Sequence, residues 1–106
     1  MLGMDRRNKM ALTKETTQDK IEVVGAFKSI QVRTKIAVLE DGVELSASFN
    51  RHMLQCVYSV RNDDDSWTHA DTDVSGESTE VQAIANAVWT DSVKAAKRTE
   101  NETSIV

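Results

Sequence analysis

The sequence predicts a small α+β protein, in which an antiparallel sheet built on one β-hairpin is followed by one C-terminal amphipathic helix. Three observations predict this class. Residues 29–39 alternate between apolar and polar side chains, which is the period of a half-buried strand. Asp41-Gly42 comes next, and this pair is a preferred two-residue hairpin turn. Residues 79–98 then repeat apolar side chains at helical spacing.

The predicted hairpin joins strands 29–39 and 43–53 through the Asp41-Gly42 turn. Pairing outward from this turn places on one face Ile30, Val32, Thr34, Ile36, Val38, Leu45, Ala47, Phe49, Arg51 and Met53. The other face collects Gln31, Arg33, Lys35, Ser48, Asn50 and His52. Apart from Val32 opposite Arg51, the first face is nearly all apolar. A one-residue slip would mix the two faces, so this pattern predicts the register.

The segment before the hairpin contributes a short strand, Ile21–Val24, which is β-branched and ends at Gly25. Residues 1–19 are polar and show no sustained periodicity, so we expect a flexible N-terminal tail. The single folded domain is then expected over 20–98, with a frayed C-terminus over 99–106.

The segment after the hairpin is expected to hold one more strand at Val57–Val60 and then an acidic loop over 61–77. Residues 61–80 carry seven acidic groups and one basic group, which is more than the whole net charge of −4. Loops beyond about 12–15 residues are uncommon in compact domains and are often functional or disordered.

The C-terminal helix has a start signal, because Ser78 or Thr79 can cap it and Thr79 with Gln82 fits a capping box. Its apolar stripe consists of Val81, Ile84, Ala85, Val88 and Trp89, and extends to Val93 and Ala96. We expect Ile30, Ile36, Val38, Leu45 and Phe49 to pack beneath Ile84, Val88 and Trp89.

The sequence offers no constellation for catalysis. Cys56, the only cysteine, has neither a disulfide partner nor zinc-site spacing, and has no base beside it. There is no glycine-rich phosphate loop, and the Asp residues of the acidic loop lack regular calcium-loop spacing. We therefore expect a non-enzymatic protein with no metal or cofactor. No apolar run is long enough to span a bilayer and no signal peptide is visible, so we expect no membrane and a reducing, intracellular origin.

Four residues are candidates for contact with a partner. Trp67 lies in the acidic loop, where it either folds back onto the domain or anchors a subunit interface. Arg33, Lys35 and His52 lie on the polar face of the hairpin, which is expected to face solvent or another subunit. The same face could contact phosphates, although it lacks the interleaved aromatic residues of a single-strand binding platform.

A family resemblance rests on several segments of residues 10–95. These are Met10–Lys20 with Ile21-Glu22-Val23-Val24-Gly25, then Ile30-Gln31-Val32-Arg33-Thr34, Glu40-Asp41-Gly42, Phe49-Asn50-Arg51-His52, Val81-Gln82-Ala83-Ile84 and Val88-Trp89-Thr90. With them the chain resembles small proteins of tailed phages and cyanophages of aquatic bacteria, a family without established function. The chain departs from that family in its extension before Met10 and in a longer Cys56–Asp71 segment. The resemblance implies a virion or tail component and assigns no site residues.

The expected function is therefore that of a phage structural or assembly protein that acts as a homo-oligomer, in the virion or the host cytoplasm. A core this small is readily completed by a neighbouring subunit, and other virion proteins are further expected partners. The alternative is a small nucleic-acid-binding protein that uses the Arg33 and Lys35 face and the basic N-terminal arm. The acidic net charge makes this alternative the less favoured one.

Overall fold

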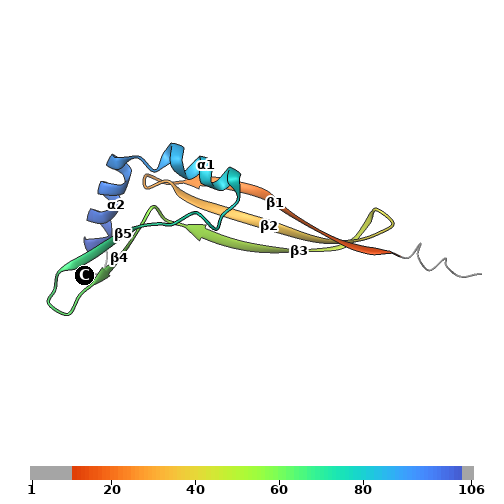
Figure 1. Cartoon of the computed structure of the whole chain (residues 1–106), viewed down its shortest axis with the longest axis horizontal. Coiled ribbons are helices and arrows are strands. Elements are labelled where there is room, and N and C mark those ends of the chain that lie inside the picture. Colours follow the sequence, from red (N-terminus) through yellow and green to blue (C-terminus); the bar gives the residue numbers. More distant parts are fainter. Residues whose placement is uncertain (1–10, 104–106) are drawn as a thin grey trace, which may run out of the picture. The chain divides into compact units, whose positions relative to one another are not determined.

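The computed structural model describes residues 11–103 and has a mixed α+β architecture (Figure 1). Its elements in chain order are β1 (Leu12–Val24), β2 (Ser29–Glu40), β3 (Val43–Leu54), β4 (Val57–Arg61), β5 (Trp67–Asp71), α1 (Thr79–Val88) and α2 (Asp91–Thr103). The α+β class and the hairpin of β2 and β3 agree with the prediction from the sequence.

The chain divides into two compact units. In the described part of the chain, the first, called the sheet unit below, contains residues 11–20 and Val32–His52. The second, called the helical unit, contains Ile21–Gln31 and residues 53–103. Only strands contribute to the described part of the sheet unit, whereas the helical unit contains both helices and the β4–β5 hairpin.

The larger sheet has the order β1-β2-β3, so β1 and β3 are its edge strands. The turn between β2 and β3 lies at Asp41 and Gly42, whose φ angles are 51° and 85°. Positive φ at both positions is what a type I′ turn requires, and this turn matches the twist of the strands that it joins. The predicted hairpin turn is confirmed.

The predicted N-terminal tail is wrong for residues 12–19, because β1 is a strand of 13 residues and not a short one. Residues 1–10 lie outside the described part of the chain. Nearly every side chain of β1 is exposed, so no apolar alternation reveals the strand in the sequence. Its stability comes from backbone pairing with β2, and a polar, charged composition is what an exposed edge strand usually has.

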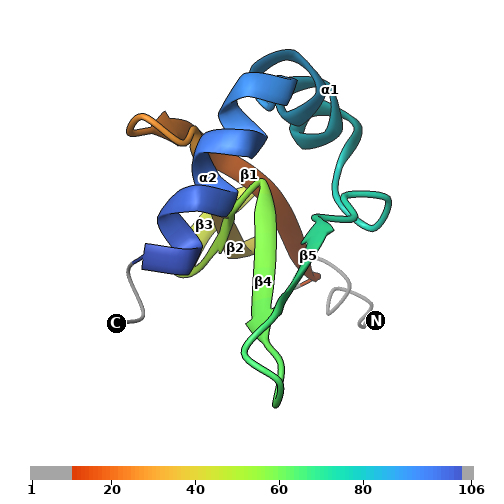
Figure 2. The ribbon, with the colours of Figure 1, turned by 90° about the vertical axis from the view of Figure 1, so that its left-hand side faces the viewer.

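The predicted acidic loop over 61–77 is also wrong in its middle, where β5 pairs antiparallel with β4 (Figure 2). The two strands meet in a tight turn, in which the Asn62 amide donates to the Ser66 carbonyl over 2.7 Å. Asp64 accepts from both the amide and the hydroxyl of Ser66, at 3.0 and 2.6 Å. Part of the acidic run is therefore turn chemistry, because aspartate side chains readily bond to the backbone two residues on.

The predicted single helix over 79–98 is two helices, because α1 ends at Val88 and α2 begins at Asp91. Trp89 leaves the helical conformation at φ −89° and ψ 71°, and its indole N–H donates to the Lys28 carbonyl over 2.7 Å. The Thr90 hydroxyl then accepts from the Val93 amide over 3.3 Å and so caps the start of α2. The expected fraying from residue 99 is wrong up to Thr103; residues 104–106 lie outside the described part.

The predicted start and stripe of α1 are confirmed in their main features. The Ser78 hydroxyl accepts from the Val81 amide, so Ser78 is the N-cap. The predicted pairing of Thr79 with Gln82 is wrong, since the Gln82 amide group donates to the Glu77 carbonyl over 2.8 Å. On the stripe, Val81, Ala85 and Trp89 are buried.

The buried apolar residues of the described chain are Ile30, Val32, Ala37, Cys56, Val57, Val81, Ala85 and Trp89. The prediction that Leu45 and Phe49 belong to the core is wrong, because both are exposed. The described sheet unit consists of strands alone and supplies no second layer that would cover an apolar face of β3.

Candidate functional site

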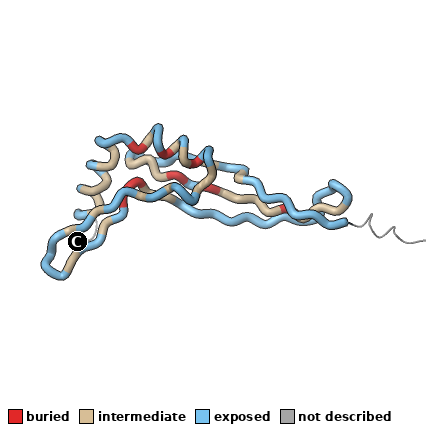
Figure 3. The backbone as a smooth tube through the Cα atoms, in the orientation of Figure 1, coloured by how far each residue is buried: buried red, intermediate tan, exposed pale blue. Residues whose placement is uncertain are grey.

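An exposed apolar row runs along edge strand β3 of the sheet unit. The side chains of Val43, Leu45, Ala47 and Phe49 alternate along the strand and therefore share one face. Strand β3 is exposed along nearly its whole length (Figure 3). All four side chains are exposed, and the larger ones, Val43, Leu45 and Phe49, keep 65%, 57% and 42% of their surface accessible. Exposed apolar side chains that gather in one place mark a candidate interaction site.

Arg33 in β2 contacts a side chain on each of the two neighbouring strands, β1 and β3. Its guanidinium group donates to both carboxylate oxygens of Asp19 in β1, at 3.1 and 2.7 Å. On its other side it lies over the ring of Phe49 in β3, 4.6 Å from the ring centroid. The hydrogen bond from Arg33 holds the pKa of the Asp19 carboxyl below its usual range.

The contact of Arg33 with Phe49 corrects the predicted hairpin faces, which put these two side chains on opposite sides. The buried positions of β2 show the same change, because Val32 and Ala37 are both buried although they lie five positions apart, an odd offset. Strict alternation would expose one of the two. The sequence pattern therefore predicts the hairpin and its turn, but not one uniform pair of faces along β2.

Lys35 and His52, the other candidates of the sheet unit, also lie on strands. The ammonium group of Lys35 lies 2.9 Å from a Glu44 carboxylate oxygen, and His52 is exposed on β3. Arg33 and Lys35 thus both have carboxylate partners within the unit. The described part of the sheet unit is balanced in charge, with five basic and five acidic side chains.

Trp67, the candidate of the helical unit, is the first residue of β5 and pairs with Arg61. Its ring stacks on that of His69, with centroids 6.3 Å apart and planes inclined by 5°. The side chain is half-buried and contacts its own hairpin. Both alternatives for Trp67, folding back onto the domain and anchoring a subunit interface, stay predictions.

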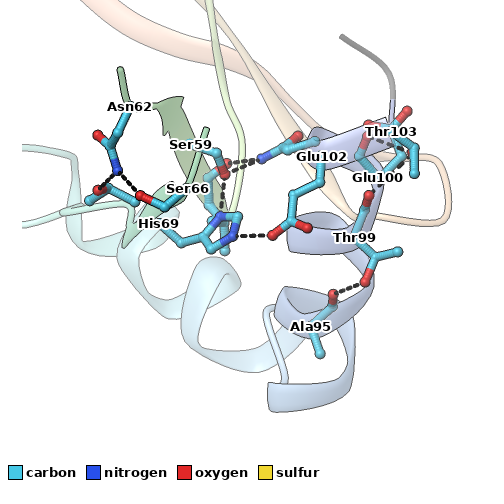
Figure 4. A network of polar contacts seen from close by, with 12 residues as sticks. Ser59, Asn62, Ser66, His69, Ala95, Thr99, Glu100, Glu102 and Thr103 are labelled. Atoms are coloured by element: carbon cyan, nitrogen blue, oxygen red, sulfur yellow. Dashed lines mark hydrogen bonds and ion pairs between the residues drawn. The ribbon is translucent and has the colours of Figure 1, made fainter. Parts of the chain in front are cut away.

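A polar network in the helical unit connects the β4–β5 hairpin to α2 (Figure 4). Ser59 and His69 are direct partners in the β4–β5 ladder, and the Ser59 hydroxyl oxygen lies 2.6 Å from His69 Nδ1. His69 Nε2 lies 2.7 Å from a carboxylate oxygen of Glu102 in α2. The Asn101 amide group donates to the Ser59 hydroxyl over 2.9 Å and to the Val57 carbonyl over 3.4 Å.

The donors and acceptors of this network form one consistent chain when His69 is neutral. Asn101 donates to the Ser59 oxygen, the Ser59 hydroxyl donates to Nδ1, and the Nε2–H group donates to the Glu102 carboxylate. The order serine, histidine, carboxylate is that of a nucleophilic triad. Here, however, Ser59 is half-buried inside a strand and its oxygen already accepts from Asn101. The arrangement therefore fixes α2 to the hairpin.

Further polar contacts hold α2, which has no buried residue of its own. Lys94 lies 3.1 Å from one Asp71 carboxylate oxygen, and the Lys97 ammonium group lies over the Phe27 ring, 5.2 Å from its centroid. The sequence alone could not reveal these contacts, because they depend on the β4–β5 register and on the phase of α2. The single helix predicted from the sequence does not contain the break at Thr90. This break changes which side chains of α2 lie toward the β4–β5 hairpin.

Residues 11–103 do not meet the requirements of a metal site or of a membrane-spanning helix. Within that range no group of three or more His, Cys, Asp or Glu side chains is placed to hold a metal ion. Nor does that range contain a helix that is long and apolar enough to cross a membrane. Cys56 is fully buried, and burial raises the pKa of its thiol.

Comparison of the chain with protein-family models, with curated proteins and with solved structures finds no match.

Proposed function

We propose that this protein is a non-enzymatic structural or assembly protein that acts as a homo-oligomer, and that edge strand β3 is its self-association surface. The observation that carries the proposal is the exposed row of Val43, Leu45 and Phe49 on an unpaired strand edge. An edge strand offers unpaired backbone groups, and an apolar row adds a hydrophobic driving force for pairing with another chain.

The two edges of the sheet differ in how they are protected against pairing. Edge strand β1 carries charged side chains along its length, at Lys14, Glu15, Asp19, Lys20 and Glu22. Strand β3 contains neither lysine nor proline, and its segment 45–50 has no charge at all. Charged side chains, lysine above all, are the usual protection of an edge. The composition therefore favours β3 over β1 as the pairing edge.

A second copy is the partner that the charges favour. Five basic and five acidic side chains balance in the described sheet unit, so two copies meet without net repulsion. Nucleic acid receives less support, because Arg33 and Lys35 are both engaged with carboxylates of the same unit. Phosphate binding would have to displace those carboxylates.

The phage setting belongs to the same proposal and rests on the resemblance of residues 10–95 to small proteins of tailed phages. A virion or tail component commonly works by symmetric assembly, and self-association through β3 is consistent with such a role. The corresponding location is the virion or the host cytoplasm.

The test is the solution mass of the full chain by light scattering over a range of concentrations, for the wild type and two variants. Leu45→Glu places a charge in the centre of the apolar row. Val60→Glu is the matched control, because Val60 is a similarly exposed apolar residue, at 63% against 57%, on strand β4.

We expect a defined oligomer for the wild type and for Val60→Glu. Leu45→Glu should dissociate, because each copy loses about 1.5 kcal/mol or more of apolar burial. Two such losses per dimer raise the dissociation constant by roughly 100-fold or more. A monomeric wild type would contradict the proposal, as would equal effects of the two variants. Tight oligonucleotide binding at low salt by a monomer would favour the nucleic-acid alternative.

A further inference from the structure

The centre of β3 reads almost the same in both directions. Leu45-Ser46-Ala47-Ser48-Phe49 has an apolar residue at each end, a serine inside each of them and one alanine in the middle. When two identical strands pair antiparallel about a two-fold axis, every contact occurs twice, and residue i meets j where j meets i. A segment with this mirror pattern is self-complementary in such a pair.

We propose that two copies pair antiparallel through β3 with Ala47 on the two-fold axis, which deepens and rests on the self-association proposed above. This register sets Leu45 of one copy opposite Phe49 of the other, twice, with Ala47 facing Ala47 between them. Directly opposed aliphatic and aromatic side chains stabilise a strand pair. Ser46 faces Ser48 on the other side of the strands, so the centre of the contact contains only small side chains there.

The two neighbouring two-fold registers give either less favourable opposed side chains or a shorter ladder. Moving the axis to Ser48 would set Leu45 against Arg51 and leave Phe49 against Ala47. Moving it to Ser46 would keep apolar pairs but would shorten the ladder, because β3 begins at Val43. With Ala47 on the axis the ladder runs from Val43 to Arg51.

The charges of β3 also fit an axis at Ala47. Glu44 then faces the uncharged Asn50, so no like charges stand opposite each other. Arg51 faces Val43 and has Asp41 of the other copy as its diagonal neighbour, within reach of a long side chain. Each copy contributes the same contact, so the opposite charges are brought together twice.

Single cysteines locate the axis directly, because a disulfide requires Cα atoms about 4.4–6.8 Å apart. A residue on the axis faces its own copy and satisfies this distance. Ser46 and Ser48 lie one position from the axis, so each is displaced by two positions along the strand from its own copy and does not satisfy it. Full-length Ala47→Cys, Ser46→Cys and Ser48→Cys are oxidised mildly and separated on a non-reducing gel. The wild type is the control, because its only cysteine, Cys56, is fully buried.

We expect Ala47→Cys to give a disulfide-linked dimer as its main product, and Ser46→Cys or Ser48→Cys alone to give none above the wild type. An equal mixture of Ser46→Cys and Ser48→Cys should link, because this register sets those two positions opposite each other. Linkage of Ser46→Cys or Ser48→Cys alone would overturn the register. No linkage by any variant, with an oligomeric mass in solution, would overturn the pairing through β3 and leave self-association standing. A monomeric mass would overturn both.

Discussion

Asn101 is the residue whose loss should weaken the attachment of α2 to the β4–β5 hairpin. No side chain of α2 is buried, so the helix depends on polar contacts more than on apolar packing. The Asn101 amide group makes two of them, to the Ser59 hydroxyl over 2.9 Å and to the Val57 carbonyl over 3.4 Å. Both acceptors belong to β4, and Asn101 is half-buried where it meets them.

The size of the effect of Asn101→Ala follows from these two bonds. A hydrogen bond contributes about 0.5–1.5 kcal/mol net, and the longer of the two lies at the weak end of that range. The variant should therefore lose about 1–2 kcal/mol of the free energy that holds α2 in place. Amide exchange through local opening of α2 should then accelerate by roughly 5- to 30-fold.

Native-state hydrogen exchange measured residue by residue is the suitable assay, because it separates local opening from global unfolding. Thr99→Ala is the matched control on the same helix. The Thr99 hydroxyl donates only to the Ala95 carbonyl of α2 itself, over 3.2 Å. Its loss changes helix propensity as Asn101→Ala does, by up to about 0.7 kcal/mol, without touching β4, and exchange in α2 should stay within about threefold of the wild type.

Two outcomes would refute this reasoning. If Asn101→Ala accelerates exchange in α1 as much as in α2, the amide group stabilises the whole unit and not the attachment of one helix. If it leaves exchange in α2 unchanged, the contacts of Lys94, Lys97 and Glu102 hold the helix without it.

Two further predictions concern groups outside this network. Trp89→Phe should lower the free energy of unfolding by about 1–3 kcal/mol, because the Lys28 carbonyl loses the indole donor at 2.7 Å; Trp67→Phe, at a half-buried site, is the control in urea titrations, and equal losses would contradict the prediction. The lowered pKa of Asp19 means that its pairing with Arg33 stabilises the folded state fully above the ordinary carboxyl pKa of 3.8. That contribution is lost as pH falls from there through the lowered value. Stability measured from about pH 5 to about pH 3 should therefore fall less steeply for Asp19→Asn than for the wild type, and parallel curves would refute the assignment.

Features set by local rules could be predicted from the sequence. The Asp41-Gly42 turn needs positive φ at both positions, and both residues have it. Ser78 caps α1 as expected, and the helical spacing picks out Val81 and Ala85, which are buried. Each of these depends on a few neighbouring residues, so no long-range information is needed to find them.

The polar strands could not be predicted in the same way. Almost all of β1 is exposed, and β5 alternates only between half-buried and exposed residues. For this reason neither strand has a strong apolar alternation in its sequence. Each exists because a neighbouring strand supplies its backbone hydrogen bonds, and that neighbour is fixed by topology. The helix break was more accessible, because Thr90-Asp91-Ser92 is an N-terminal signal inside the predicted helix.

The candidate site residues show the same contrast between local features, which the sequence predicts, and long-range contacts, which it does not. The sequence singles out Arg33 and Lys35 as candidate residues, but it predicts neither their shared face nor their carboxylate partners Asp19 and Glu44. Asp19 lies in a strand that has no apolar alternation in the sequence. The network of Ser59 and His69 depends on the β4–β5 register and on a third residue in α2. Because these partners lie on three different elements, no fixed spacing in the sequence identifies them.

The difference between the two edges of the sheet sets the size of the assembly expected from the proposed pairing through β3. Pairing of β3 with β3 of a second copy would use the β3 edges of both copies at once, because the contact is two-fold symmetric. The edges that remain are the two β1 strands, whose charged side chains oppose further pairing. Association through β3 alone is therefore closed at two copies, whereas pairing of β3 with β1 would continue without end. A dimer in solution supports the symmetric contact, and filaments that lengthen with concentration would support the head-to-tail contact instead.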